Sequence, residues 1–346
     1  SSPDGSLHIN SMQDVHVNSS GRVFINGVDI LQLEEQQRQI IYLLRDLNNT
    51  VPDLEFLQGV DLAGRGLESF TFRFSRAIRG DVNLQHNLLT AVHFGHVTKI
   101  VGDVNLNHND LAVVDFAHIT RVDGAINLSN NELTLIDFGH LTRVEGGINA
   151  RGNDLGSIDF RTIARVDGDI TLMENELTSI HLGDLAVLGG SLEVMSNFVS
   201  TVSLHQLTTV GNDINFYNNG LTSVHFGQLA AVEGDIYLHT NSLVNIPFGN
   251  VTKVGGYMNL SRNKLTSLSF ESIATVGNDL LLYRNALTSI DFGQLTHVGG
   301  SIWVQLNPNL ATLDCTGVTI QGCVCVDSGV AVTNCSSLCT DSACNQ

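Results

Sequence analysis

Apolar residues return at the same points of a 22-residue cycle along most of the chain, so the sequence predicts a stack of equal coils. Within one cycle, Val104 and Leu106 alternate with polar residues, as in a strand with one buried face. A second alternation, Val114 and Phe116, follows. One coil cannot bury its apolar side alone, but stacked coils share a continuous core. We count 12 coils over residues 58–314, which at about 4.8 Å per coil predicts a rod roughly 55–60 Å long.

Asparagine occupies one position of the cycle in eleven consecutive coils: Asn87, Asn109, Asn131, Asn153, Asn175, Asn197, Asn219, Asn241, Asn263, Asn285 and Asn307. Its amide offers donors and an acceptor. We therefore expect a structural ladder in which each buried Asn satisfies backbone groups of its own coil and the next. A row that includes Phe94 and Phe116 is predicted to stack inside the core.

Only Gly or Asn occupies the position two residues before each strand, for example Gly102, Gly124 and Asn212. Both residue types tolerate positive φ better than others do. The row predicts a tight corner with positive φ before every strand.

The segment Val104-x-Leu106-x-x-Asn109-x-Leu111 resembles the leucine-rich-repeat signature. The whole coil is similar to receptor-L-domain-like repeats, which read G-D-I-x-L-x-x-N-x-L-T-x-I. That resemblance covers about three quarters of the chain. It implies an extracellular protein that binds a partner or builds a structure, as in receptor ectodomains and fungal cell-wall proteins. Two departures, the four-residue step from Ile100 to Val104 and the constant coil length, favour a straight, β-helix-like solenoid over a curved horseshoe.

The ends of the solenoid need covers, because an open end exposes core and strand edges. Residues 1–57 are predicted to form an N-terminal cap of short strands followed by a helix over 29–49. The helix has apolar residues at heptad spacing, so it either docks on the first coil or associates with other copies of the chain. Residues 315–346 are predicted to form a Cys-rich C-terminal cap.

All six cysteines lie in that last segment: Cys315, Cys323, Cys325, Cys335, Cys339 and Cys344. An even number in so short a stretch predicts disulfides, whereas zinc is disfavoured by the lack of a CxxC pair and of nearby His. Disulfides indicate an extracellular, oxidising location. Six N-glycosylation sequons agree with it: Asn18, Asn48, Asn127, Asn250, Asn259 and Asn334.

The composition excludes several classes of partner. The formal charge is −18 and the pI about 4.9, which argues against nucleic acid and against a polybasic membrane anchor. No apolar run is long enough to span a bilayer. Motifs for hydrolases, metalloproteases and nucleotide-binding sites are absent from the sequence. We therefore expect a non-enzymatic protein without cofactor or metal.

The outward strand positions form a surface whose character changes along the chain. They are short and polar in the first half, whereas four of the five Tyr and the only Trp cluster later on. The candidate binding residues are Tyr217, Tyr237, His239, Tyr257, Arg262, Tyr283, Arg284 and Trp303. Tyr, Trp and Arg are enriched at binding hot spots, and aromatic faces also suit sugar rings. The competing interpretation is chance placement of bulky residues on a polar sheet.

Three further rows have functional and structural interpretations. His96, His118 and His140 should stack, as a polar row or as metal ligands. A recurrent Gly-Asp pair, as at Asp103, suggests a calcium-binding site. A Thr row that includes Thr134 suggests an ice-binding surface. Both rows are interrupted along the chain, which favours structural roles for them.

We thus expect an extracellular recognition or adhesion protein that binds a protein or glycan through its sheet face. The alternative is a structural building block of a cell wall, sheath or filament that oligomerises through its N-terminal segment. The recognition hypothesis depends on the aromatic residues near Tyr217–Trp303. The structural hypothesis depends on residues 29–49.

Overall fold

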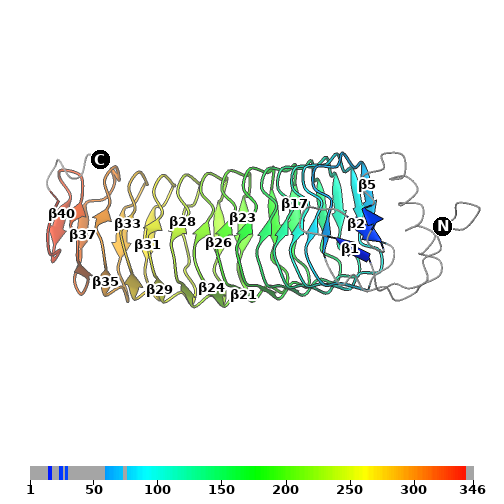
Figure 1. The fold of residues 1–346 in the computed structure, drawn as a ribbon. Coiled ribbons are helices and arrows are strands. Elements are labelled where there is room, and N and C mark those ends of the chain that lie inside the picture. Colours follow the sequence, from blue (N-terminus) through cyan, green and yellow to red (C-terminus); the bar gives the residue numbers. More distant parts are fainter. Residues whose placement is uncertain (1–14, 18–22, 26–27, 30–58, 73–75, 340–346) are drawn as a thin grey trace, which may run out of the picture.

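The chain forms an elongated parallel β-solenoid (Figure 1). The computed structural model describes residues 15–17, 23–25, 28–29, 59–72 and 76–339. Coils follow one another along the rod in sequence order, and each contributes a short strand to up to three faces. The predicted mainly β solenoid of 22-residue coils is confirmed. Within the described ranges there is no helix that could cross a membrane.

The first face is a continuous sheet of 13 strands, here called the long sheet. Its strands pair in parallel at a constant step, so that Val104 lies opposite Val82 and Ile126. The strands are β4 (Val60–Asp61), β7 (Val82–Asn83), β10 (Val104–Asn105), β13 (Ile126–Asn127), β16 (Ile148–Asn149), β19 (Ile170–Thr171), β22 (Leu192–Glu193), β25 (Ile214–Asn215), β28 (Ile236–Tyr237), β30 (Met258–Asn259), β33 (Leu280–Leu281), β36 (Ile302–Trp303) and β39 (Val324–Cys325).

A second continuous sheet of 12 strands was missed in the sequence, because each strand has only two residues and too short an alternation to detect. Its strands are β6 (Ala77–Ile78), β9 (Lys99–Ile100), β12 (Arg121–Val122), β15 (Arg143–Val144), β18 (Arg165–Val166), β21 (Val187–Leu188), β24 (Thr209–Val210), β27 (Ala231–Val232), β29 (Lys253–Val254), β32 (Thr275–Val276), β35 (His297–Val298) and β38 (Thr319–Ile320).

The third face is divided into one sheet of four strands and four sheets of two. The four-stranded sheet contains β5 (Ser69–Thr71), β8 (Ala91–His93), β11 (Val113–Asp115) and β14 (Leu135–Asp137). The pairs are β17 (Ser157–Asp159) with β20 (Ser179–His181), β23 (Thr201–Ser203) with β26 (Ser223–His225), β31 (Ser267–Ser269) with β34 (Ser289–Asp291), and β37 (Thr312–Asp314) with β40 (Ala331–Thr333). Coils are therefore bonded continuously on two faces only.

The described part of the N-terminal segment is a small antiparallel sheet of β1 (Val15–Val17), β2 (Val23–Ile25) and β3 (Val28–Asp29). β1 and β2 form where the sequence alternates. The helix predicted over 29–49 lies, except for Asp29, outside the described residues. At the other end, β38, β39 and β40 come from the Cys-rich segment and extend the three faces of the stack.

Side chains that point inward from every face fill one continuous core. Val104 and Leu106 are fully buried, as their alternation predicts. The Phe row also stacks inside, with ring centroids of Phe94 and Phe116 5.5 Å apart.

The Asn row forms a hydrogen-bonded ladder, with nine of its members buried and Asn219 and Asn241 half-buried. Nδ2 of Asn175 donates to the carbonyls of Leu172 (3.1 Å) and of Ala150 in the coil before (2.9 Å). Its Oδ1 accepts the N–H of Leu155, 3.2 Å away. Each amide thus bonds to its own coil and to the preceding one, whereas we expected the next one.

The positive φ predicted for the Gly row is wrong. No residue of that row has positive φ; the residue before each ladder Asn has it instead, at 52–58° for ten non-glycine residues. The Gly row has a different cause: Oδ1 of Asp81 accepts the N–H of Asp103 at 2.9 Å. A Cβ on Gly102 would lie 2.3 Å from that oxygen and 2.6 Å from the backbone nitrogen of Asp81. At Gly146 and Gly168 a Cβ would meet backbone atoms of the coil before, so the row is explained by the close approach of the coils.

Replacing Gly102 should therefore be costly. We expect Gly102→Ala to lower the free energy of unfolding by roughly 1–3 kcal/mol, as overpacking does. The control is Gly156→Ala, because nothing lies within 4 Å of a Cβ there. Denaturant unfolding measures both, and equal stabilities would contradict the close approach of the coils.

The ladder makes a second prediction. Asn175→Ala leaves buried backbone groups without partners, each costing about 1–3 kcal/mol, so we expect a loss of roughly 2–4 kcal/mol in calorimetry or denaturant unfolding. Glu176→Ala, at the next residue but exposed, should change stability by less than about 0.5 kcal/mol. A loss at Asn175 no larger than at Glu176 would show that the ladder is dispensable.

Candidate functional site

The aromatic candidates share the long sheet, as their places in the 22-residue cycle of the chain predict. Tyr237 and Trp303 lie in β28 and β36, three coils apart. Tyr217 and Tyr283 occupy the next outward position after β25 and β33, and Tyr257 immediately precedes β30. We call Tyr217, Tyr237, His239, Tyr257, Tyr283 and Trp303 the aromatic patch. Each successive Tyr from Tyr217 to Tyr257 is 20 residues on, so the three run diagonally across the sheet.

Rings of neighbouring coils contact one another. Tyr217 and His239 stack with centroids 4.2 Å apart, and Tyr237 meets His239 edge-on at 6.0 Å. The Tyr237 hydroxyl donates to Asp235 at 2.5 Å. Burial, and then this contact with the carboxylate, raises the pKa of Tyr237. The rings of Tyr217, Tyr237 and His239 therefore hold one another in place.

Two buried polar atoms in the patch lack a hydrogen-bond partner within the protein: Nδ1 of His239 and Nε1 of Trp303. An unpaired buried polar atom costs free energy. The Tyr and Trp residues are half-buried except Tyr257, which is 36% exposed.

Arg262 and Arg284 lie beside the patch rather than in it. Both are exposed at the coil corner, immediately before a ladder Asn, with φ of 55° and 57°. Burial, and then the charge of Arg262, lowers the pKa of His239. His239 is therefore preferentially neutral in the folded protein.

The sequons differ in accessibility. Asn259 lies within the aromatic patch, is 8% exposed, and accepts a hydrogen bond from the fully buried Ser261 at 2.7 Å. A glycan on Asn259 is incompatible with this packing. Asn127 is half-buried, and Asn250 and Asn334 are exposed. Asn18 and Asn48 lie outside the described residues.

The Gly-Asp row and the Thr row have structural roles. The Asp of the Gly-Asp pairs accepts a backbone N–H from the next coil, as Asp169 does from Ser191 at 2.7 Å. The Thr hydroxyls donate to carbonyls of the coil before, as Thr178 does to Gly156 at 3.1 Å.

The His rows stack without converging. His96, His118 and His140 are exposed, with centroids 6.2 and 6.5 Å apart. Among the described residues, none of these histidines belongs to a group of side chains close enough to share a metal ion. Stacked rings at this spacing behave as a polar row.

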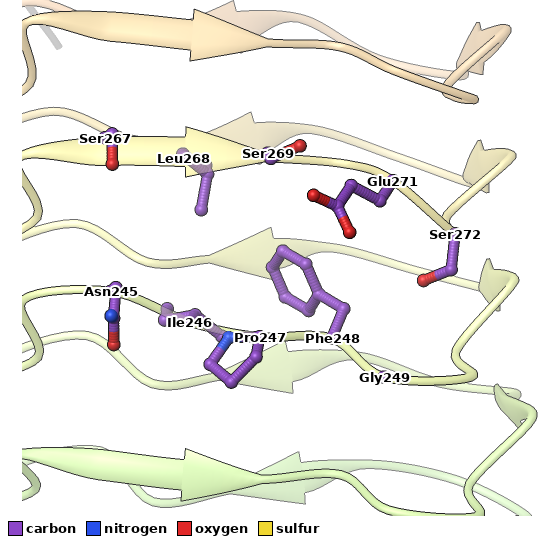
Figure 2. Close-up of a pocket in the computed structure, with 10 residues that line it drawn as sticks. All are labelled: Asn245, Ile246, Pro247, Phe248, Gly249, Ser267, Leu268, Ser269, Glu271 and Ser272. Carbon is purple, nitrogen blue, oxygen red and sulfur yellow. The ribbon is translucent and has the colours of Figure 1, made fainter.

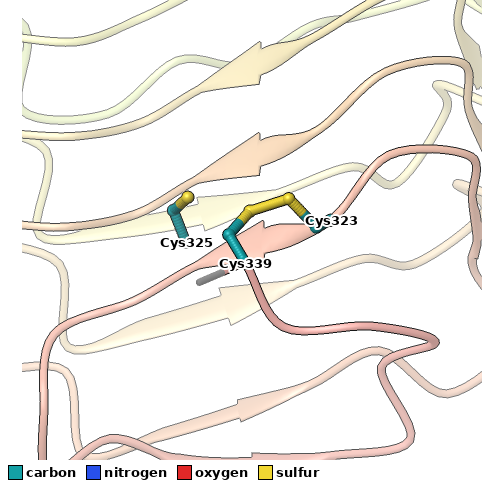
Figure 3. A group of neighbouring side chains, drawn as sticks. All are labelled: Cys323, Cys325 and Cys339. Atoms are coloured by element: carbon teal, nitrogen blue, oxygen red, sulfur yellow. A yellow bond between two sulfur atoms is a disulfide. The ribbon is translucent and has the colours of Figure 1, made fainter. Parts of the chain in front are cut away.

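Three cysteines do converge at the C-terminal end: the sulfurs of Cys323, Cys325 and Cys339 lie within 4.8 Å of one another (Figure 3). Cys323 and Cys339 are joined by a disulfide, as are Cys315 and Cys335. Cys325 is disulfide-bonded as well, so none of the three sulfurs is available as a thiolate ligand. Cys344 lies outside the described residues. The group closes the solenoid end and does not form a metal site.

The structure also contains a cleft that the sequence analysis missed. Its volume is about 360 Å³, and it opens on the third face between two coils (Figure 2). The ring of Phe248 lies between these coils, near Glu271 and Leu268. No strand forms at 245–247, where Pro247 has no N–H to donate. The sequence signal for this cleft was Pro247, which occupies a strand position of the 22-residue cycle.

Ion pairs neutralise most of the described cations, chiefly on the second sheet. There, Lys99 contacts Asp123 at 2.9 Å, and Arg143 contacts Asp167 at 3.1 Å. Burial raises the pKa of the Asp123 carboxyl, but hydrogen bonds from Lys99 and Arg121 outweigh it, so that pKa lies below its ordinary value.

Comparisons with known proteins find only distant structural likenesses. No protein-family model and no curated protein sequence matches the chain. Among solved structures, the leucine-rich-repeat domain of APL1B is 14% identical over 89% of this chain and 95% of that one, with a TM-score of 0.44. The leucine-rich effector YopM of Yersinia pestis is 17% identical over 84% of both chains, at 0.45. InlJ of Listeria monocytogenes is 14% identical over 78% and 68%, at 0.36. These scores are low, so the likenesses say nothing about what this chain binds.

The position of His239 makes a pH prediction. Removing the nearby charge with Arg262→Gln should raise the pKa of His239, while burial keeps it below the ordinary value. Because the folded pKa of His239 is lowered, stability is highest above the unfolded pKa of the imidazole. It declines as pH falls from that value through the lower folded pKa, because the unfolded chain takes up the proton first. NMR titration of the imidazole measures the shift. Arg151→Gln, on a distant coil, is the matched control and should leave the pKa unchanged.

Proposed function

We propose that this chain is an extracellular, non-catalytic recognition or adhesion protein that binds a protein or a glycan through the aromatic patch of the long sheet. The observation that carries this proposal is the gathering of four Tyr, one Trp and His239 on adjoining coils of one face. Rigid aromatic side chains supply contact area at low entropic cost.

An oxidising location is supported by the two disulfides, Cys315–Cys335 and Cys323–Cys339. Among the sequons we expect Asn250 to carry a glycan, because its side chain is exposed. Asn259 should stay unmodified, which keeps the aromatic patch open.

The second candidate is a structural block of a wall, sheath or filament. Its support is the rod itself, whose coils never change length, and the link between copies would come from the N-terminal segment. A mass measurement separates the two: a polymer that disappears when residues 1–49 are removed favours the structural role.

Binding through the patch is tested with a glycan array and a panel of extracellular proteins probed with the full chain. For whichever probe binds, Tyr237→Ala with Trp303→Ala should weaken affinity at least tenfold, since the two changes remove large aromatic side chains from two coils of the patch. The melting temperature should stay within a few degrees.

The matched control is Asn105→Ala with Asn149→Ala, at the same strand position on distant coils. Binding that survives loss of Tyr237 and Trp303, or that falls equally in the control, would refute the patch.

A further inference from the structure

A second surface runs the length of the rod where the long sheet turns toward the third face. We call it the ladder corner: it consists of the two positions that flank each ladder Asn. The members that carry the argument are Leu88, Asp110, Glu132, Asp154, Glu176, Phe198, Arg262, Lys264, Arg284 and Leu306, all exposed. They project side by side at intervals of one coil, about 4.8 Å.

Charge along the ladder corner is segregated. Four acidic residues, Asp110, Glu132, Asp154 and Glu176, follow one another on consecutive coils, and three basic ones gather farther along. No ion-pair partner within 4.0 Å is found among the described residues for any of the three cations, whereas those of the second sheet are paired. In a chain with 35 acidic and 17 basic residues, such a cluster of unpaired cations is unexpected.

The same corner carries three exposed apolar side chains. Phe198 is 65% exposed, more than any other large apolar residue described, and Leu88 and Leu306 are 54% and 52% exposed. Leu88 lies five coils before Phe198, and Leu306 lies on the coil five after it. The apolar residues are therefore placed symmetrically about Phe198.

The charges share this symmetry. Glu132 lies three coils before Phe198, and Lys264 lies three coils after it, with Arg262 on the same coil. Asp110 lies four coils before, and Arg284 is on the coil four after. A surface whose two halves complement each other about a central point is what a two-fold symmetric interface requires.

We infer that the ladder corner binds the ladder corner of a second copy of this chain, antiparallel, with the two-fold axis at Phe198. The two Phe198 rings then meet on the axis, and Leu88 meets Leu306 at each end. Glu132 faces Arg262 and Lys264, and Asp110 faces Arg284. Asp154 and Glu176 face the uncharged Ser242 and Gly220, so no like charges are opposed.

Other arrangements fit worse. In a parallel pair every coil meets its own copy, which places Glu132 against Glu132 and Lys264 against Lys264; like charges in contact disfavour this. An antiparallel pair shifted by one coil separates Phe198 from its counterpart and Leu88 from Leu306.

The ladder corner is also long enough to form a dimer interface of ordinary size. From Leu88 to Leu306 it spans ten coil steps, about 48 Å. A standard interface of roughly 800 Å² per partner then needs a strip about 17 Å wide, which the corner and the flanking outward positions supply. This inference is independent of the proposed function, except that it assigns Arg262 and Arg284 to self-association.

Sedimentation of the full chain tests the proposal. We expect a concentration-dependent dimer that weakens as salt is raised. Glu132→Lys should weaken it at least tenfold, whereas Asp184→Lys, the same charge change at an exposed site off the corner, should leave it unchanged. Circular dichroism checks that both variants fold.

Mixing gives a sharper readout. In D110K/E132K the charged positions that face each other across the interface are all basic, and in R262E/K264E/R284E they are all acidic. Each variant alone should therefore be monomeric, and an equal mixture should form a heterodimer. Register is read by cysteine crosslinking: F198C should form a covalent dimer on oxidation, and S242C, which faces Asp154, should not.

A monomer at all concentrations overturns the proposal, as does a dimer that Glu132→Lys leaves intact, which would implicate a different segment such as residues 29–49. Crosslinking of S242C instead of F198C overturns the antiparallel register. Loss of the dimer without loss of binding to the aromatic patch leaves the proposed function standing, so the two fail separately.

Discussion

Close stacking of identical coils is the constraint on which the rest of the molecule depends. The Asn ladder hydrogen-bonds each coil to the one before it, and the backbone of the long and second sheets does the same on two faces. Every other recurring residue adapts to that spacing: Gly102 lacks a side chain because the Asp81 carboxylate fills the space, and Thr178 uses its hydroxyl on the previous coil. Rows that suggest calcium or ice binding are thus explained by the stack itself.

The backbone conformation at the ladder corner is energetically unfavourable. The residue before each Asn is held at positive φ even when it is Thr240 or Arg262, types for which that conformation is unfavourable by about 1–2 kcal/mol. The four hydrogen bonds of the next residue outweigh this cost. Corner side chains are consequently free to vary in charge and size, because the backbone conformation there is imposed by Asn and not by the variable residue.

Periodicity made the fold and the sharing of one face by Tyr237 and Trp303 predictable, since a 22-residue step places side chains side by side. Three features were less accessible. The strand at Lys99–Ile100 is too short to alternate. The Gly row has a steric cause that depends on atoms of the neighbouring coil, such as those of Asp81 next to Gly102. The contact between Tyr217 and His239 depends on which way each ring leans, which no spacing encodes.

The interrupted third face has a mechanical consequence. Between β14 and β17, and around Pro247, no strand pairing resists separation of the coils on that side, while the other two faces remain bonded throughout. The rod is therefore softest toward bending that opens the third face. Such flexing changes the curvature of the long sheet while its hydrogen bonds stay intact, so an uneven target can be matched without unfolding a coil.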